Sequence, residues 1–312
     1  MLTEIIWLTV NELLWTSMAT NSSNTSQVRP WPLPSSTCIP WLVLHSTECL
    51  AIVILNLITI TVFVKQRQLQ RRSTYLIIHL VIVDLLVGAV SGPMQIHLKM
   101  IWCYGELEGY DITYLGINLA IRPFFPFASL VNLTFISLER AHATYRPFKH
   151  RFIKKWVYGV VIALIYFLTV CKGAIEGLTN WPLNHIWVYS FYPILILVIC
   201  LCYILIFIKV HCDGRPKQHG EASRRERKLT ITLFLVTCAS VLTFLPISIY
   251  EGITYLHIMA FPKFSSDFQI SCTILTLFLA NSLINPLLYA VRMPEFRAGI
   301  SKAVLCERLK TI

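Results

Sequence analysis

The amino-acid sequence predicts an all-α membrane protein: a bundle of seven transmembrane helices with a short cytoplasmic amphipathic eighth helix. Of its 312 residues, 55% are hydrophobic and only 14% are charged, whereas a water-soluble domain carries about a quarter charged residues. Seven apolar runs reach the roughly 20 residues that a helix needs to cross a bilayer. Basic residues gather in alternate segments between these runs, as they do in multi-pass membrane proteins.

The seven runs follow one another along most of the chain, and no soluble second domain interrupts them. We expect membrane spans at residues 39–64, 75–98, 112–143, 153–175, 185–209, 229–256 and 268–291. Residues 1–38 then form an N-terminal segment, residues 39–291 form the helix bundle, and residues 292–312 form the amphipathic helix and a short tail.

The distribution of Lys and Arg predicts how the chain is oriented. The segment 65–73, "KQRQLQRRS", holds four basic residues and no acid. The segments after the third and fifth runs, and the tail, are also basic, while the opposite segments hold Glu106, Glu108, Asp111 and Asp267. Basic loops stay in the cytoplasm, so we expect a plasma-membrane protein with its N-terminus outside. The net charge of +11 is explained by this bias, and we predict no nucleic-acid partner.

The N-terminal segment supports the same orientation. Its stretch "NSSNTS" offers two glycosylation acceptors, Asn21 and Asn24, which function only on an extracellular surface. The first 15 residues resemble a signal peptide weakly, because Glu4 and Glu12 interrupt the apolar run. Translation from Met1 or from Met18 fits the sequence equally well.

Several polar residues lie inside the apolar runs. A carboxylate such as Asp84 costs roughly 2.5–3.5 kcal/mol at the centre of a membrane helix, so it needs a partner inside the bundle. We expect Ser129, Asn281, Ser282 and Asn285 to meet Asp84 at mid-depth. Such an oxygen-rich pocket suits a hard cation, and sodium is the candidate. A water cluster, or a protonated carboxylate that serves packing alone, would explain the same residues.

An acid and a base are adjacent where the third run meets a basic loop. Glu139 and Arg140 could form a simple interfacial anchor, which is the more common role for such a pair. Glu226, however, begins the sixth run at the same predicted depth. Arg140 could therefore pair with either acid, and this arrangement predicts a latch with a closed and an open state.

These motifs together resemble the rhodopsin-like (class A) G-protein-coupled receptors. The stretch "LERAHATYRPF" is similar to the end of that family's third helix, and "NPLLY" (Asn285, Pro286 and Tyr289) matches the motif of its seventh helix. Five further positions keep the family's spacing: Asn56, Leu80, Asp84, Pro246 and Phe296. Each motif alone is weak, but their order on seven successive runs is specific.

The resemblance implies a receptor without enzymatic activity. An unknown extracellular ligand would act through outward movement of the sixth helix on a heterotrimeric G protein, with arrestin and membrane lipid as further partners. Glu139, Arg140, Glu226, Asn285, Pro286 and Tyr289 would form the activation switch. A receptor-shaped protein that does not signal is an alternative. A seven-span transporter is less consistent with the sequence, because no inverted repeat is present.

The ligand class is less constrained by the resemblance. The family's amine receptors carry an aspartate where this chain has Arg122, so an anionic or carboxylate ligand is one interpretation. An internal ion pair of Arg122 with Glu176 or Glu251 is an equal alternative. Phe125 and Phe244 complete the candidate pocket, with Phe244 replacing the family's tryptophan. No cofactor is expected apart from sodium as an allosteric modulator.

The family's usual disulfide is absent, because Leu115 replaces its first cysteine and residues 173–190 contain no second one. Three other cysteines lie near the outer face. We predict a Cys38–Cys272 bridge, since the first and seventh helices are neighbours in this fold. Cys103 is the competing partner for either residue, and three free thiols are the remaining alternative.

Overall fold

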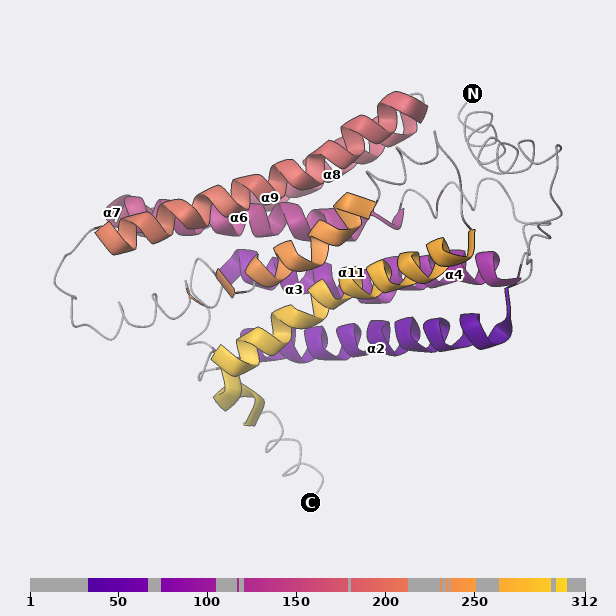
Figure 1. The fold of residues 1–312 in the computed structure, drawn as a ribbon. Coiled ribbons are helices and arrows are strands. Elements are labelled where there is room, and N and C mark those ends of the chain that lie inside the picture. The colour runs from indigo at the N-terminus through magenta and orange to yellow at the C-terminus, as the bar shows by residue number, and fades with distance from the viewer. Residues whose placement is uncertain are drawn as a thin grey trace, which may run out of the picture.

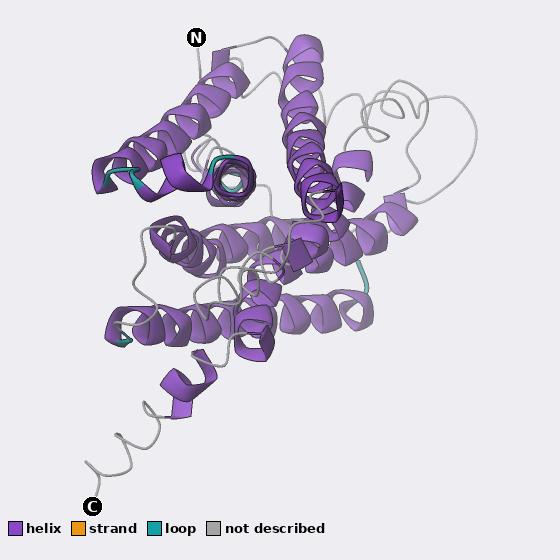
Figure 2. Ribbon diagram, turned by 90° about the vertical axis from the view of Figure 1, so that its left-hand side faces the viewer, coloured by secondary structure: helices purple, strands orange, loops and turns teal. Residues whose placement is uncertain are grey.

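The structure is a computed structural model that describes residues 33–66, 74–104, 117, 121–178, 181–212, 231, 234–235, 237–250, 264–292 and 296–301. All regular secondary structure in these ranges is helical (Figure 2). The elements are α2 (Ser35–Lys65), α3 (Thr74–Leu86), the π-helical turn η2 (Val87–Ser91), α4 (Gly92–Tyr104), α6 (Phe124–Tyr145), α7 (Pro147–Arg151), α8 (Lys155–Leu178), α9 (Trp181–Cys212) and α11 (Phe264–Arg292). A further apolar helix spans Thr237–Tyr250.

Most predicted spans reappear with boundaries shifted by a few residues. Within the part of the chain that the structure describes, five stretches are long and apolar enough to cross a membrane: Ser35–Lys65, Thr74–Ile101, Lys155–Ile175, Ser190–Lys209 and Phe268–Val291. The third predicted span is represented by α6, and the sixth by Thr237–Tyr250. Residues 296–301 are helical, but the rest of the predicted eighth helix lies outside the described residues.

Helix α6 lies in the interior of the bundle, in contact with α3, α8 and α9 (Figure 1). Every side chain from Pro126 to Thr134 is buried, so this helix has no exposed face over more than two turns. The peripheral helices differ: Leu50 of α2, Phe167 of α8 and Phe207 of α9 are each more than 60% exposed. An apolar exterior around a polar-containing interior fits a lipid environment.

Two glycines set the distance between α2 and the second span. A Cβ added to Gly88 would lie 2.7 Å from Cγ2 of Ile52, and one added to Gly92 would collide with the sulfur of Cys49. The two positions form a G-x-x-x-G pair, which lets membrane helices approach closely. Gly88 lies in the π-helical turn η2 and Gly92 directly follows it. The spacing therefore positions the second span against α2 one turn from Asp84.

The disulfide differs from the prediction. Cys38 is bonded to Cys103, with the two Cα atoms 6.0 Å apart, and Cys272 is a buried free thiol. The predicted Cys38–Cys272 bridge is therefore wrong. The backbone N–H of Leu33 donates to the carbonyl of Cys103 at 3.1 Å, which holds the start of α2 against the end of α4. The carbonyl of Cys272 instead accepts from Nε2 of His45 at 3.1 Å, two turns farther along α2.

The two ends of the bundle are named here by their contents. The disulfide end contains Cys38 and Cys103, and the Arg140 end contains α7 and the last turns of α6.

Candidate functional site

A fully buried carboxylate lies at the centre of the bundle. Oδ1 of Asp84 accepts hydrogen bonds from the hydroxyls of Ser129 at 2.9 Å and Ser282 at 3.0 Å. Its Oδ2 accepts from Nδ2 of Asn285 at 2.6 Å. The three donors come from α6 and α11, so one side chain of α3 ties three helices together. Hydrogen bonds to a charged acceptor of this kind are stronger than those between neutral groups.

The structure therefore brings three of the four residues predicted around Asp84 into contact with it. The fourth, Asn281, accepts from the hydroxyl of Thr243 at 3.4 Å through its Oδ1, which links α11 to the helix Thr237–Tyr250. Oδ1 of Asn285 is buried and has no hydrogen-bond partner among the described residues. A carboxylate, two hydroxyls and a spare amide oxygen are the oxygen ligands that hard cations prefer.

The proline of α11 is compensated by a residue of α2. Pro286 has no N–H, so the carbonyl of Ser282 loses the helical partner it would otherwise have. Nδ2 of Asn56 donates to that carbonyl at 3.1 Å, and also to the carbonyl of Ile52 at 2.9 Å. The break in the α11 ladder is thereby satisfied from α2, next to the Asp84 centre.

Tyr289 completes this region on the side of the Arg140 end. Its ring lies edge-on to Phe63 at 5.9 Å and near Phe296 at 6.4 Å. All three side chains are fully buried. The hydroxyl of Tyr289 has no partner among the described residues, so this polar group is held in place by aromatic packing.

Another carboxylate that is largely shielded from solvent, that of Glu139, lies at the Arg140 end. Its Oε2 accepts from Nε of Arg140 at 2.6 Å and lies 2.5 Å from Nη2. Its Oε1 bonds Nε2 of His150 at 2.7 Å and accepts from the hydroxyl of Tyr158 at 3.4 Å. The side chains of Glu139 and Arg140 are 10% and 5% exposed. The predicted second acid of the latch, Glu226, lies outside the described residues.

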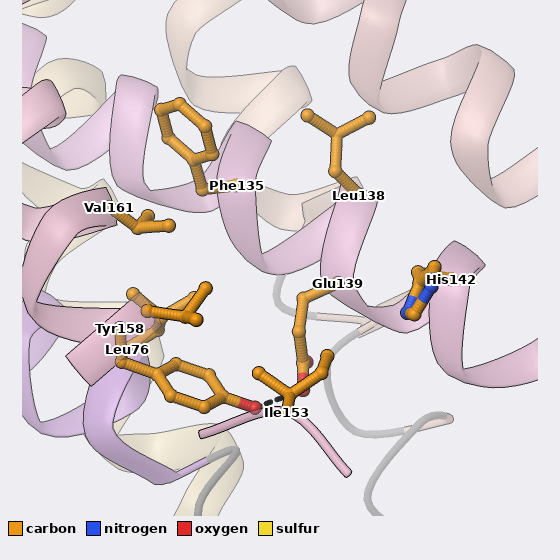
Figure 3. Close-up of a pocket in the computed structure, with 9 residues that line it drawn as sticks. Leu76, Phe135, Leu138, Glu139, His142, Ile153, Tyr158 and Val161 are labelled. Atoms are coloured by element: carbon orange, nitrogen blue, oxygen red, sulfur yellow. Dashed lines mark hydrogen bonds between the residues drawn. The ribbon is translucent and has the colours of Figure 1, made fainter. Parts of the chain in front are cut away.

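Glu139 also borders a cavity of about 290 Å³ between α3, α6 and α8 (Figure 3). Most of its wall is apolar: Leu76, Phe135, Leu138, Ile153, Val157 and Val161. Figure 3 shows the Tyr158 hydroxyl reaching Glu139 across one end of this cavity. The carboxylate therefore has two basic side chains on one side and hydrocarbon on the other.

The predicted ligand pocket is described only in part. Arg122 lies half-buried in the turn before α6, and Phe125 lies edge-on to Phe124 at 5.3 Å. Phe244 is buried between Tyr192, at 6.4 Å, and Phe278, at 5.6 Å. The side chain of Glu176 and the whole of Glu251 lie outside the described residues, as do the glycosylation candidates Asn21 and Asn24.

Sequence reasoning missed three buried or half-buried bases. Lys172 of α8 is 3% exposed and lies over the rings of Phe127, at 5.2 Å, and Tyr192, at 5.8 Å. Lys99 of α4 donates to the hydroxyl of Ser271. His150 binds Glu139, as described above. A lysine inside an apolar run was a visible signal for Lys172, and Lys99 directly follows the second run, whereas nothing in the spacing of His150 indicated its partner.

The chain matches the family model described as "7 transmembrane receptor (rhodopsin family)" over residues 55–184 and 176–289. It belongs to this family. Trace amine-associated receptor 9 of Rattus norvegicus is 28% identical, over 89% of this chain and 89% of the relative. Somatostatin receptor type 2 of Sus scrofa is 26% identical, over 96% and 85% respectively. The histamine H2 receptor of Homo sapiens is 24% identical, over 77% and 72%.

Membership establishes a rhodopsin-like receptor with a seven-helix bundle in a membrane, from a family that is generally not enzymatic. It also gives the two carboxylate centres a context. The Asp84 centre and the Glu139–Arg140 pair lie on the helices where the family's motifs were recognised in the sequence. Receptors of this family work with a ligand and a G protein.

The contact between Asn56 and the carbonyl of Ser282 can be tested by a double-mutant cycle. Asn56→Ala should lower the stability of the purified receptor by about 1–3 kcal/mol, because it leaves a buried carbonyl unpaired. In a Pro286→Ala background the loss should be smaller, since the new N–H can donate to that carbonyl. Thermal unfolding in detergent measures both.

Asn132→Ala is the matched control, because Asn132 donates to the carbonyl of Leu76 at 3.1 Å and has no link to Pro286. The loss of stability caused by Asn132→Ala should be the same in the wild type and in the Pro286→Ala variant. An Asn56→Ala loss that is also unchanged by Pro286→Ala would contradict the proposed compensation.

Proposed function

We propose that this receptor couples a ligand bound at the disulfide end to a heterotrimeric G protein at the Arg140 end. The disulfide end and the N-terminus with Asn21 and Asn24 face outward, and the Arg140 end faces the cytoplasm at the plasma membrane. The observation that carries the proposal is the buried pair of Arg140 and Glu139 at 2.5 Å. A guanidinium held this way is available to a protein partner only after the helices around it separate.

The sixth helix is the element whose movement would release Arg140. The hydroxyl of Thr237 donates to that of Tyr203 at 3.1 Å, which joins the helix Thr237–Tyr250 to α9 near Arg140. Outward movement of that helix breaks this contact and withdraws Glu226 from Arg140. Tyr289, packed on Phe63 and Phe296, can then move inward. Arrestin would bind the same opened end.

Removing the second acid should therefore raise basal signalling. Glu226→Ala deletes one restraint on Arg140, so the fraction of open receptor increases without ligand. Nucleotide exchange should be measured on a panel of purified G proteins, at equal receptor concentration in nanodiscs. We expect a several-fold higher basal rate than in wild type, and an Arg140→Ala variant that stays at the level of empty discs.

Equal basal rates of nucleotide exchange for wild type and Glu226→Ala would contradict the proposed latch. Failure of every G protein to respond to wild type, Glu226→Ala and ligand alike would favour a receptor-shaped protein that does not signal.

The ligand is proposed to carry an anionic group, such as a carboxylate. Arg122 lies at the disulfide end of α6, and Lys172 is buried in the half of α8 nearest that end. The relatives' names refer to trace amines, histamine and somatostatin, but amine binding in the family relies on an aspartate where this chain has Arg122. Phe125, Phe244, Glu176 and Glu251 are the further contact candidates.

Matched pairs of compounds, each a carboxylate and its neutral amide, test this charge preference. Carboxylates should activate more strongly in the G-protein assay, and Arg122→Gln should reduce their potency by at least about tenfold, the loss of one charge-assisted contact. The amides should be unaffected by Arg122→Gln. A preference for amides or amines in wild type would overturn the assignment.

A sodium ion at the Asp84 centre is the second ligand that we propose. Asp84, Ser129, Ser282 and Asn285 supply the oxygen atoms, and Asn281 is close enough along α11 to serve as an outer ligand. The ion would favour the packing described here, in which Asp84 is bonded to both α6 and α11. It would neutralise the charge of the Asp84 carboxylate, which is fully buried.

Thermal stability should then depend on the identity of the salt. The purified receptor should unfold several degrees higher in sodium chloride than in equimolar choline chloride, because a ligand of the folded state stabilises it. Asp84→Asn should abolish the difference, because it removes the charge while keeping the size of the side chain. Equal melting temperatures of the wild type in both salts would remove the sodium site.

A further inference from the structure

The carboxylate of Glu139 is shared between two basic residues. One oxygen contacts Arg140 at 2.5 Å, and the other contacts His150 at 2.7 Å. Arg140 lies on the same helix as Glu139, whereas His150 lies on α7, the short helix that follows Pro147. The side chain of His150 is 20% exposed, so protons from the aqueous phase can reach it.

The charges around His150 are predominantly positive. Helix α6 presents Glu139, Arg140 and His142, whose ring centroid lies 6.0 Å from that of His150. Helix α8 presents Tyr158, which shares the same carboxylate oxygen. On α7 and its flanks, Arg146 and Lys149 are exposed. Among the described residues, Glu139 is thus the one acid in contact with this group.

Histidine changes its charge between about pH 5 and 8. When His150 is protonated, two cations contact one carboxylate, and Arg140 and His150 repel each other. When Arg140 leaves, that repulsion disappears. Glu139 then remains beside the apolar wall of its cavity, where an unpaired carboxylate is costly. Protonated His150, already at 2.7 Å, is the group that can pair with it.

We propose that His150 is the counter-charge that takes over Glu139 when Arg140 is released, so that cytoplasmic acidification favours the open receptor. The inference rests on the proposed function for the identity of the open state. It assigns His150 as a positioning residue that acts through Glu139. Helix α7, which carries His150, then becomes the proton-sensitive part of the latch. The sign is fixed by charge: protonation stabilises the state in which His150 is the only cation on Glu139.

The distance between two spin labels tests the proposal without a ligand or a G protein. Lys65 of α2 and Ile231, beside the sixth helix, are both exposed and can be replaced by cysteine in a receptor in which five other cysteines are serine. These are the partly exposed free cysteines Cys171, Cys200 and Cys238, and Cys212 and Cys306. In nanodiscs, the ratio of long to short distances between the two labels should rise at least about fivefold from pH 8 to pH 6. This rise corresponds to a modest coupling between protonation of His150 and opening of the receptor.

Two variants separate His150 from other titrating groups. His150→Tyr keeps a donor for Glu139 but has no charge in this range, so the ratio should become independent of pH. His142→Asn, the neighbouring histidine, should leave the response intact. A flat wild-type profile, an unchanged response in His150→Tyr, or a response lost in His142→Asn would each overturn the proposal.

The same samples separate this inference from the proposed function. A pH response of the label distance that depends on His150, without activation of any G protein, would leave the inference standing and contradict the proposed coupling. G-protein activation combined with a label distance that does not change with pH would support the proposed coupling and contradict the inference.

Discussion

The arrangement of the bundle depends on how the carboxylate of Asp84 is satisfied. A charge at this depth needs hydrogen-bond donors, and its three donors come from α6 and α11. Shifting α11 by one residue would rotate Ser282 and Asn285 by about 100° away from Asp84. Apolar packing alone tolerates such shifts, because lipid tails are as apolar as leucine side chains and neither contact is strongly preferred. The buried charge therefore selects one register for three helices, and Asn56 extends that selection to α2 through the carbonyl freed by Pro286.

The same reasoning explains which parts of the structure the sequence could predict. The length of the apolar runs fixes the spans, and polar residues inside those runs must face the interior. Asp84, Ser129, Ser282 and Asn285 could therefore be grouped before any coordinates existed, and the structure places them together. Asn281 was grouped with them but is turned by about one helical step from Ser282. Its amide meets Thr243 instead, a distinction that requires the rotation of α11.

Contacts between helix ends could not be predicted in this way. Two of the neighbours of helix α2, α4 and α11, each carry a cysteine near the disulfide end. Burial and spacing do not distinguish them, so Cys272 was chosen although Cys103 is the partner. The backbone bond between Leu33 and Cys103, which decides the pairing, has no sequence signature. The contact of His150 with Glu139 is of the same kind, because it depends on how α7 folds back onto α6.

The carboxylates of Asp84 and Glu139 differ in the charge of their partners, and this difference separates their roles. Asp84 is surrounded by hydroxyl and amide donors, which satisfy its lone pairs but leave a net negative charge. Such a centre attracts a small cation and repels an anion. Glu139 is bound by a guanidinium and an imidazole, so its cluster is neutral or positive according to the charge of His150. A cluster of that sign gains nothing from a metal ion. When His150 is protonated, the cluster can give up Arg140 to an acidic or carbonyl-rich partner and still leave Glu139 paired, which is the chemistry that an opened protein-binding surface provides.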